Sequence, residues 1–280
     1  PDRDRPARAR RLPLAARPAL PPRAGALVTR GRLAMDPQNI YDDPEFFAGY
    51  SCMERFGAGW TRAMEHDDLL ALLPPVAGRR VLDLGCGAGQ LAHHLATDGA
   101  AEVLGVDLSE RMLDRARAEW AHPRETYRRE AIEALVFERA RFDLVVSSLA
   151  FHYVEDYAGL MTRIAVWLAP GGVLVYSIEH PIYTARLPGE GWVVDAEGRR
   201  TGWRLDRYAE EGPREETWFV AGVRKVHRTL ATLIDGLIDA GLVVERLVEP
   251  VPSERWLRDH PVWADERRRP IFLLVRAGKP

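Results

Sequence analysis

The sequence predicts an α/β fold, with a mostly parallel β-sheet and helices packed on both of its faces. Short apolar runs alternate with stretches of helical periodicity from residue 81 to residue 178, which is the pattern of consecutive βαβ units. A glycine-rich turn, Gly85-x-Gly87-x-Gly89, directly follows the first apolar run and precedes a helical stretch, as at the first strand–helix junction of a doubly wound sheet. With 280 residues, one core with elaborations is expected.

Two helices are expected before the sheet. Asp43 and Pro44 have the features of an N-cap followed by proline at the first helical position, so a short helix begins there and continues through Tyr50. A second helix is expected from Thr61 to Leu73, where two prolines follow. The alternating elements are then strand Val81–Leu84, helix Gly89–Thr97, strand Glu102–Val106, helix Ser109–Trp120, strand Asp143–Ser147, helix Tyr157–Leu168 and strand Val173–Ile178.

The alternation breaks after His180. Residues 181–225 contain three prolines, several glycines and many charged residues without a long periodicity, so an insertion is expected there rather than another βαβ unit. A helix is expected from Val226 to Ala240, with Gly241 as its C-terminal stop. Two final strands follow, Val243–Leu247 and Ile271–Val275.

Residues 1–34 differ in composition from the rest of the chain. They hold nine Arg and two Asp, a local charge of +7, which leaves −9 on the remainder of a chain whose net charge is −2. This Arg/Pro-rich extension is predicted to be disordered, and a start site assigned too far upstream of Met35 is the favoured explanation for it. Residues 35–280 are expected to form one domain, with 35–75 as a helical N-terminal cap.

Composition argues against several classes of protein. No apolar run approaches the roughly 20 residues that a membrane-spanning helix needs. The acidic remainder of the chain offers no general attraction to nucleic acid. Cys52 and Cys86 are too few for a disulfide framework, which fits a cytoplasmic setting, and neither belongs to a cluster with metal-ligand spacing. We expect no metal, no nucleic-acid or membrane partner, and a monomer or homodimer.

The glycine turn is suited to binding a nucleoside. Glycines allow the backbone to turn sharply and to approach a ligand without obstruction by a Cβ atom. Such a turn is weak as an indicator by itself. Here Asp83 precedes it, and Asp107 ends the second expected strand, 18 residues past Gly89. A carboxylate at that strand end can accept hydrogen bonds from both ribose hydroxyls.

Four segments together resemble the successive motifs of class I S-adenosylmethionine (SAM)-dependent methyltransferases. They are VLDLGCGAGQ (81–90), GVDLSERML (105–113), FDLVVSSLAFHYVED (142–156) and LAPGGVLVYS (168–177). The resemblance implies a Rossmann-like, seven-stranded, mostly parallel sheet with an antiparallel last strand, and an insertion at 181–225 that acts as a substrate lid. It also implies SAM as cofactor and a small-molecule methyl acceptor, whose methylated atom (nitrogen, oxygen or carbon) is open.

The resemblance also implies roles for individual residues. In the glycine turn, Gly85 and Gly87 would pass under the methionine part of the cofactor, with Cys86 and Gly89 in the same turn, and Asp83 would approach its amino group. Asp107 would hold the ribose. The remaining cofactor residues implied are Leu108 and Met112 at the adenine, Ser147 and Ser148 near the sulfonium, and Tyr50 and Arg55, which would close the pocket with Tyr41.

One position departs from the family pattern. An acidic residue that would accept from the adenine amine is replaced by Ala131. Either Glu130 or Glu133 substitutes for it, or the backbone amides of Ala131 and Ile132 hold the adenine.

A general base is expected at the carboxyl ends of the fourth and fifth strands. The candidates there are His152, Tyr153, Glu179 and His180, and Tyr41 above the pocket joins them. Each also has a structural interpretation: Tyr153 can pack, Glu179 can pair with an Arg, and either His can be structural.

Five of the eight Trp, at 192, 203, 218, 256 and 263, follow the fifth strand. They predict either an aromatic lid over a planar or apolar acceptor or the core of the insertion itself. His227 and Arg228, at the expected start of the Val226–Ala240 helix, can orient an anionic or hydroxylated acceptor or be solvated.

Three other classes of protein fit part of the sequence. A nicotinamide-dependent oxidoreductase is disfavoured by the Gly-x-Gly-x-Gly spacing and the PGG turn at 170–172. A SAM-binding module without catalysis is disfavoured because the sequence has both a complete glycine turn and an expected substrate lid. An RNA or other nucleic-acid methyltransferase would depend on the basic extension, and the acidic remainder counts against it.

Overall fold

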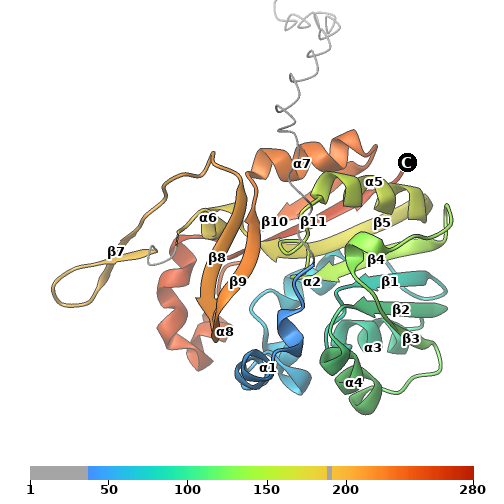
Figure 1. Cartoon of the computed structure of the whole chain (residues 1–280), viewed down its shortest axis with the longest axis horizontal. Helices are drawn as coiled ribbons and strands as arrows, with labels where there is room; N and C mark the ends of the chain where they lie inside the picture. The colour runs from blue at the N-terminus through green and yellow to red at the C-terminus, as the bar shows by residue number, and fades with distance from the viewer. Residues whose placement is uncertain (1–36, 188–190) are drawn as a thin grey trace, which may run out of the picture. The chain divides into compact units, whose positions relative to one another are not determined.

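The computed structural model describes residues 37–187 and 191–280. In this part of the chain, seven strands form one sheet in the order β10-β11-β5-β4-β1-β2-β3. The pairs from β5 through β3 are parallel, whereas β11 is antiparallel to both β5 and β10. The predicted fold class is therefore confirmed, and Figure 1 shows the sheet with its helices. The strands are β1 (Arg80–Leu84), β2 (Glu102–Asp107), β3 (Glu125–Arg129), β4 (Phe142–Ser148), β5 (Leu168–Glu179), β10 (Val243–Val248) and β11 (Phe272–Gly278).

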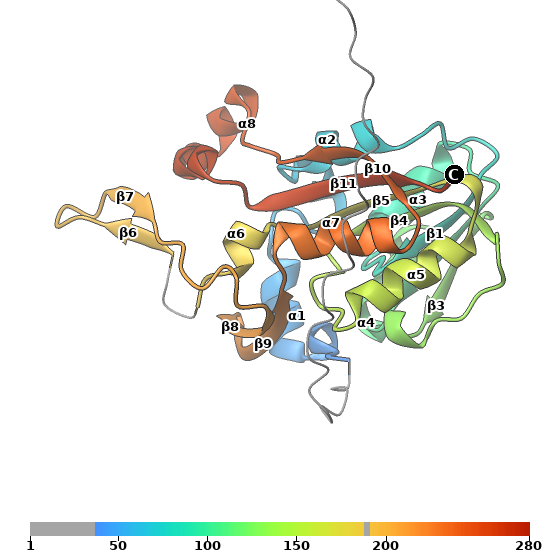
Figure 2. The same cartoon turned by 90° about the horizontal axis from the view of Figure 1, so that it is seen from above.

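Apolar side chains alternate between the two faces of the sheet, as a strand period of two requires. Leu82 and Val145 belong to the core under α5 (Tyr157–Trp167) and α7 (Leu230–Asp239). Their neighbours Val81 and Leu144 belong to the core under α2 (His66–Leu72) and α3 (Gln90–Thr97). Figure 2 shows α5 and α7 side by side along the sheet. Helix α4 (Glu110–Glu119) contacts β2 and β3.

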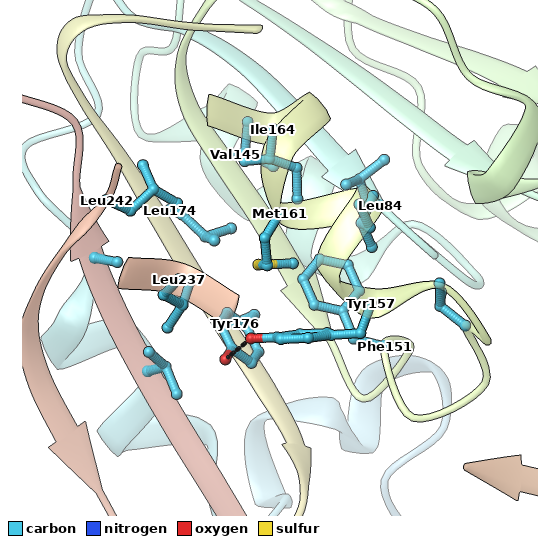
Figure 3. Packing of buried hydrophobic residues seen from close by; sticks show 14 of the residues in the cluster. Leu84, Val145, Phe151, Tyr157, Met161, Ile164, Leu174, Tyr176, Leu237 and Leu242 are labelled. Carbon is cyan, nitrogen blue, oxygen red and sulfur yellow. Dashed lines mark hydrogen bonds between the residues drawn. The ribbon is translucent and has the colours of Figure 1, made fainter. Parts of the chain in front are cut away.

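The core under α5 and α7 contains a satisfied polar pair. The hydroxyl groups of Tyr157 and Tyr176 lie 2.7 Å apart, and the Tyr157 hydroxyl also lies 3.1 Å from the carbonyl oxygen of Leu233. Figure 3 shows this pair beside Met161 and Leu237. Because each buried hydroxyl has a partner, two tyrosines fit this core without the cost of an unpaired polar group.

Side-chain caps define where several helices begin. Asp43 accepts from the backbone amides of Glu45 and Phe46, with Pro44 at the first helical position, so α1 (Pro44–Ser51) begins where it was predicted. Ser109 caps α4 through the amide of Met112. Gly241, with a φ of +81°, follows α7 as the predicted stop.

Two helix predictions have wrong boundaries. Thr61–Leu73 is not one helix, because a 3-10 helix η2 (Gly57–Arg62) precedes α2. The helix expected to begin at Val226 begins at Leu230, where Thr229 accepts from the amide of Thr232 as the N-cap. Val226 and His227 instead end strand β9 (Val220–His227), in which Val223, Lys225 and His227 alternate as buried residues. The predicted helix began inside a strand because the apolar Val226 fits either element.

Several short elements were not assigned from the sequence. The edge strand β3 consists of the polar sequence ETYRR, which carries no apolar alternation. The others are the 3-10 helices η1 (Ile40–Asp42), η3 (Ile132–Ala134) and η4 (Pro261–Arg268), and the helix α8 (Glu254–Asp259).

The insertion contains helix α6 (Pro181–Thr184) and two hairpins, β6 (Trp192–Val194) with β7 (Arg200–Trp203), and β8 (Gly212–Trp218) with β9, among the described residues. At the tip of the second hairpin, Trp218 and Phe219 pack edge-on against Phe46 of α1, with ring centroids 5.3 and 5.7 Å apart. The insertion thus contacts the N-terminal cap (Figure 1).

The expected extension at 1–34 lies outside the described residues. Among residues 37–187 and 191–280, no helix combines the length and the apolar character needed to cross a membrane.

Candidate active site

A cavity of about 830 Å³ lies at the carboxyl ends of the central strands. Its floor includes Asp83 near the end of β1 and the terminal residues of β2, β4 and β5, which are Asp107, Ser148 and Glu179. Residues of the N-terminal cap, the insertion and the α8–η4 segment form the other walls. Its volume lies in the range of cofactor and substrate pockets, and its position is where doubly wound sheets bind ligands.

The glycine turn begins directly after β1. The backbone amides of Gly85 and Cys86 both donate to the carbonyl oxygen of Val106, at 2.8 and 3.0 Å. Gly85 has a φ of +70°, and a Cβ atom there would lie 2.4 Å from the Cβ of Ala150. Gly87 has a φ of +54°, but a Cβ atom there would meet nothing within 4 Å. Gly85 is thus required by close packing, whereas Gly87 faces open space in the cavity.

Substitution of the two glycines should therefore have different effects. We expect Gly85→Ala to lower the free energy of unfolding by at least about 2 kcal/mol, because a left-handed backbone and a clash both oppose the methyl group. Gly87→Ala, the matched control, meets only the backbone cost of about 1 kcal/mol. Urea unfolding of both variants measures the difference, and equal losses would contradict this packing role of Gly85.

Asp107 holds the turn in place. One carboxylate oxygen accepts from the amide of Gly87 at 2.8 Å and the other accepts from the amide of Ser109 at 2.9 Å. Burial raises the pKa of Asp107, and these two hydrogen bonds act against that shift by stabilising the charged form. The carboxylate lines the cavity while its hydrogen bonds fix its position.

Asp83 is a buried carboxyl group without a partner. The residue is 1% exposed, and in the described part of the chain neither of its side-chain oxygens has a hydrogen-bond partner. Burial, assisted by the nearby charge of Asp107, raises the pKa of Asp83 to about 8. Since an unpaired buried carboxyl group is costly, its position on the cavity floor indicates that a cationic or hydrogen-bond-donating ligand group belongs beside it.

Most of the predicted cofactor residues lie on this cavity. Of the two residues expected to substitute at the adenine, Glu133 lines the cavity whereas Glu130 forms an ion pair with Arg128 at 3.0 Å, so Glu133 and the backbone stay open as alternatives. Arg55 lines the cavity while paired with Glu65 at 2.5 Å. The predicted cofactor residues on the wall are Tyr50, Arg55, Asp83, Gly85, Cys86, Gly87, Asp107, Leu108, Met112, Ala131, Ile132 and Ser148.

Three predicted residues are not among the described residues that line the cavity. The Ser147 hydroxyl is fully buried and donates to the carbonyl oxygen of Leu84 at 2.7 Å. Gly89 packs against Tyr127, whose hydroxyl oxygen would lie 2.6 Å from an added Cβ. His180 caps α6 through the amide of Ile182 and contacts Glu249 at 2.9 Å. The structure therefore places these three residues in the framework around the cavity rather than on the described part of its wall.

The other base candidates do lie on the cavity. The Tyr41 and Tyr153 hydroxyl oxygens are 3.3 Å apart, and burial raises the pKa of both phenols, so both remain protonated. Burial and the charge of Lys225 hold the pKa of His152 well below its usual value, so its ring is neutral at physiological pH. Glu179 pairs with Lys225 at 2.6 Å rather than with an Arg.

A charged network at the β5 end of the cavity was missed by sequence reasoning. Lys225 is 5% exposed, pairs with both Glu179 and Glu216, and lies 5.0 Å from the ring centre of Trp218. Arg186 pairs with Glu216 at 2.6 Å. One available signal was the scarcity of lysine, because the sequence contains only Lys225 and Lys279.

The Trp-rich region divides between the two expected roles. Trp218, Trp256 and Trp263 line the cavity, whereas Trp192 and Trp203 pack against each other with ring centroids 5.4 Å apart inside the insertion. His227 and Arg228 do not reach the cavity. His227 contacts Thr184 at 2.8 Å, and Arg228 donates to the carbonyl oxygens of Val154 and Glu155 at 2.5 and 2.7 Å, so both are buried structural residues and neither is solvated.

The fold and the cavity define a doubly wound α/β protein with a site suited to a nucleoside-containing cofactor and a second ligand. Comparison with known proteins agrees. A family described as "Methyltransferase domain" matches residues 81–172. A crystal structure of an S-adenosylmethionine-dependent methyltransferase from Mesorhizobium loti is 46% identical, with 78% of this chain and 98% of that chain covered and a TM-score of 0.73.

Two further proteins extend the similarity over most of the chain. A solved structure from Listeria monocytogenes in the same family is 37% identical and has a TM-score of 0.74, with 79% of this chain and 99% of that chain covered. A protein from Haemophilus influenzae, described as uncharacterized, is 35% identical over 251 residues, which are 86% of this chain and 97% of that protein. The chain belongs to the family of SAM-dependent methyltransferases.

Proposed function

We propose that this enzyme binds SAM over β1, β2 and β4 and transfers its methyl group to a small-molecule acceptor held between β5 and the insertion. The observation that carries the proposal is the unpartnered Asp83. The methionine part of SAM bears an ammonium group, which is the type of ligand group that this buried carboxylate lacks. In the same arrangement, Asp107 accepts from the ribose hydroxyls and Leu108 and Met112 contact the adenine.

The protein's part in methyl transfer is mainly to position two reactants and to exclude water. SAM supplies a methyl group that is already activated by its sulfonium, so the chain needs to align the acceptor and, where required, to remove a proton. Tyr41 and Tyr153 are protonated, and since one hydroxyl donates to the other, the second remains free to donate a hydrogen bond to the acceptor. His152 lies buried on the same wall, and because its lowered pKa keeps the ring neutral and makes it a weak base, we assign it a hydrogen bond to the acceptor rather than removal of a proton.

Contacts between two walls of the cavity support a small acceptor. The N-terminal cap and the C-terminal segment meet across it: Glu54 contacts His260 at 2.7 Å, and the Trp256 indole donates to the carbonyl oxygen of Arg62 at 3.0 Å. All four residues line the cavity. These contacts join two walls of the cavity, which favours a small-molecule acceptor rather than a polymer.

Calorimetric titration with SAM and with S-adenosylhomocysteine (SAH), followed by methylation assays with radiolabelled SAM, tests the proposal. We expect both ligands to bind, and label to enter one or more members of a panel of small acceptors but not RNA. Failure of SAM and SAH to bind would overturn the cofactor assignment. Binding without turnover on any acceptor would favour a SAM-binding module. RNA labelling that is lost when the chain is shortened to begin at Met35 would favour a nucleic-acid methyltransferase.

A further inference from the structure

Arg269 is a buried cation in the cavity wall that lacks acceptors. The residue is 7% exposed, and in the described part of the chain its Nε and Nη1 atoms are buried without hydrogen-bond partners. Its Nη2 atom forms an ion pair with Glu266 at 2.5 Å. A guanidinium has five N–H donors, so this contact leaves much of its capacity unused. Buried donors of this kind require an acceptor from elsewhere.

Glu266 does not neutralise the positive charges that surround it. Arg200 also pairs with Glu266, at 3.1 Å, and the Trp192 indole lies 3.2 Å from the same carboxylate oxygen. Two guanidinium groups therefore share one carboxylate, and one positive charge is left over. Burial lowers the pKa of Arg269 against the opposing effect of Glu266, and the charges of Arg186 and Arg200 act in the same direction as burial.

Aromatic rings hold the Arg269 guanidinium in a defined place. Its central carbon lies 3.8 Å from the ring centre of Trp203 and 5.0 Å from that of Tyr183. Arg186 lies 4.4 Å from the Tyr183 ring centre. Stacking of this kind fixes the group while leaving its N–H edges available, which is how Arg commonly recognises planar anions.

The position of Arg269 places it beside the acceptor rather than the cofactor. Two residues further along, the carbonyl oxygen of Ile271 accepts from the amide of His180, and Phe272 pairs with Glu179 at the end of β5. Asp83 is on β1, which β4 and β5 separate from β11 in the sheet. Three strand spacings of ~4.8 Å give about 14 Å, a separation that puts Arg269 at the opposite end of the cavity from the proposed ammonium site.

We propose that the methyl acceptor carries a carboxylate or phosphate group that binds to the Nε and Nη1 edges of Arg269. This inference rests on the proposed function and deepens it, because it assigns the chemical class of the acceptor. Trp256, Trp263 and Tyr183 also line the cavity, so an aromatic or apolar body attached to the anionic group fits the same space.

The test uses the full chain saturated with SAH and three small probes: benzoate, phenyl phosphate and the neutral benzyl alcohol. We expect benzoate or phenyl phosphate, but not benzyl alcohol at the same concentration, to raise the Tm in a concentration-dependent manner. Arg269→Gln should weaken this binding about tenfold or more, since a charge-assisted hydrogen bond is lost. Preference for the carboxylate or for the phosphate identifies the anion.

Arg200→Gln is the matched control. Arg200 pairs with the same Glu266 and lies 5.1 Å from the Trp192 ring centre, compared with 5.5 Å for Arg269, but only Arg269 lines the cavity. Replacement of Arg200 by Gln should change probe affinity less than about threefold. Equal losses in the two variants, or no loss in Arg269→Gln, would overturn the site. If Arg269→Gln does not fold, Arg269→Lys keeps the charge without the planar fork and should bind with reduced affinity.

SAH titration separates this inference from the proposed function. Arg269→Gln should bind SAH as the wild-type protein does, because the residue lies at the other end of the cavity. SAH binding without any preference for the anionic probes would overturn the acceptor class and leave the cofactor assignment intact. Absence of SAH binding to the wild-type protein would overturn the proposed function itself.

Discussion

Asp83→Asn is expected to make the cofactor-free enzyme more stable while it weakens SAM binding at least about 30-fold. The Asp83 carboxyl is buried without a partner in the described residues, and burial raises its pKa to about 8. In the unfolded chain an Asp titrates near pH 4, so folding at neutral pH requires the uptake of a proton. Asparagine removes this cost, which is on the order of 4 kcal/mol at pH 7. The Tm should rise by roughly 10 °C.

The pH dependence of this effect has a definite sign. Between about pH 4 and pH 8 the folded wild-type protein binds more protons at Asp83 than the unfolded chain, so its stability from this group falls as pH rises. Thermal unfolding should therefore show a gap between Asp83→Asn and wild type that is small near pH 4, widens up to about pH 8 and is constant above it. A gap that does not change with pH would contradict the raised pKa.

SAM binding should change the protonation state of Asp83 from neutral to charged. An α-amino group titrates near pH 8, so below that pH the free ammonium meets a protonated Asp83, and pairing them releases a proton. Calorimetry at pH 7 in buffers of different ionisation enthalpy should detect this release for the wild-type protein and lose it for Asp83→Asn. Equal proton release by the two proteins would assign the titrating group elsewhere.

The part of the fold that local sequence determines was predicted from it. Three of the four residues of Val81–Leu84 are apolar and the turn after them needs glycine, so β1 and its junction with α3 could be predicted. The edge strand β3 was missed because only buried strands show an apolar signature, and ETYRR has none. The start of α7 was misplaced because an apolar residue such as Val226 fits a helix as well as a strand. In the folded chain Val226 pairs with Pro213 of β8, so it belongs to a strand.

Some residues of the candidate site could likewise be placed from local sequence, whereas others could not. Residues attached to regular strand ends, such as Asp107 and Glu179, could be placed because the carboxyl ends of parallel strands share one edge. His180 immediately follows Glu179, but its ring is directed to Glu249, a contact over 69 residues that no local pattern specifies. Lys225 and Arg269 come from segments without periodicity, so only the folded structure brings them to the cavity.

Asp107→Ala is expected to weaken SAH binding more than about 100-fold, because two effects add. The variant loses the carboxylate that is proposed to accept from the ribose hydroxyls, and it also frees the amides of Gly87 and Ser109, which now bond to it at 2.8 and 2.9 Å. Loss of charge-assisted hydrogen bonds at ~1.5–3 kcal/mol each supports a loss of this size. Isothermal titration of wild type and variant with SAH measures it.

A comparison of two nucleosides separates the two effects. If Asp107 binds the ribose, wild-type protein should prefer adenosine to 2′,3′-dideoxyadenosine, and Asp107→Ala should show no preference, since only the first ligand has hydroxyl groups to lose. Asp107→Asn keeps one oxygen that can accept from Gly87 or Ser109 and should retain an intermediate preference. Weak SAH binding by Asp107→Ala without nucleoside discrimination in the wild type would mean that Asp107 acts only by holding the glycine turn. The ribose assignment would then fail, whereas the turn would keep its role as the floor of the cavity.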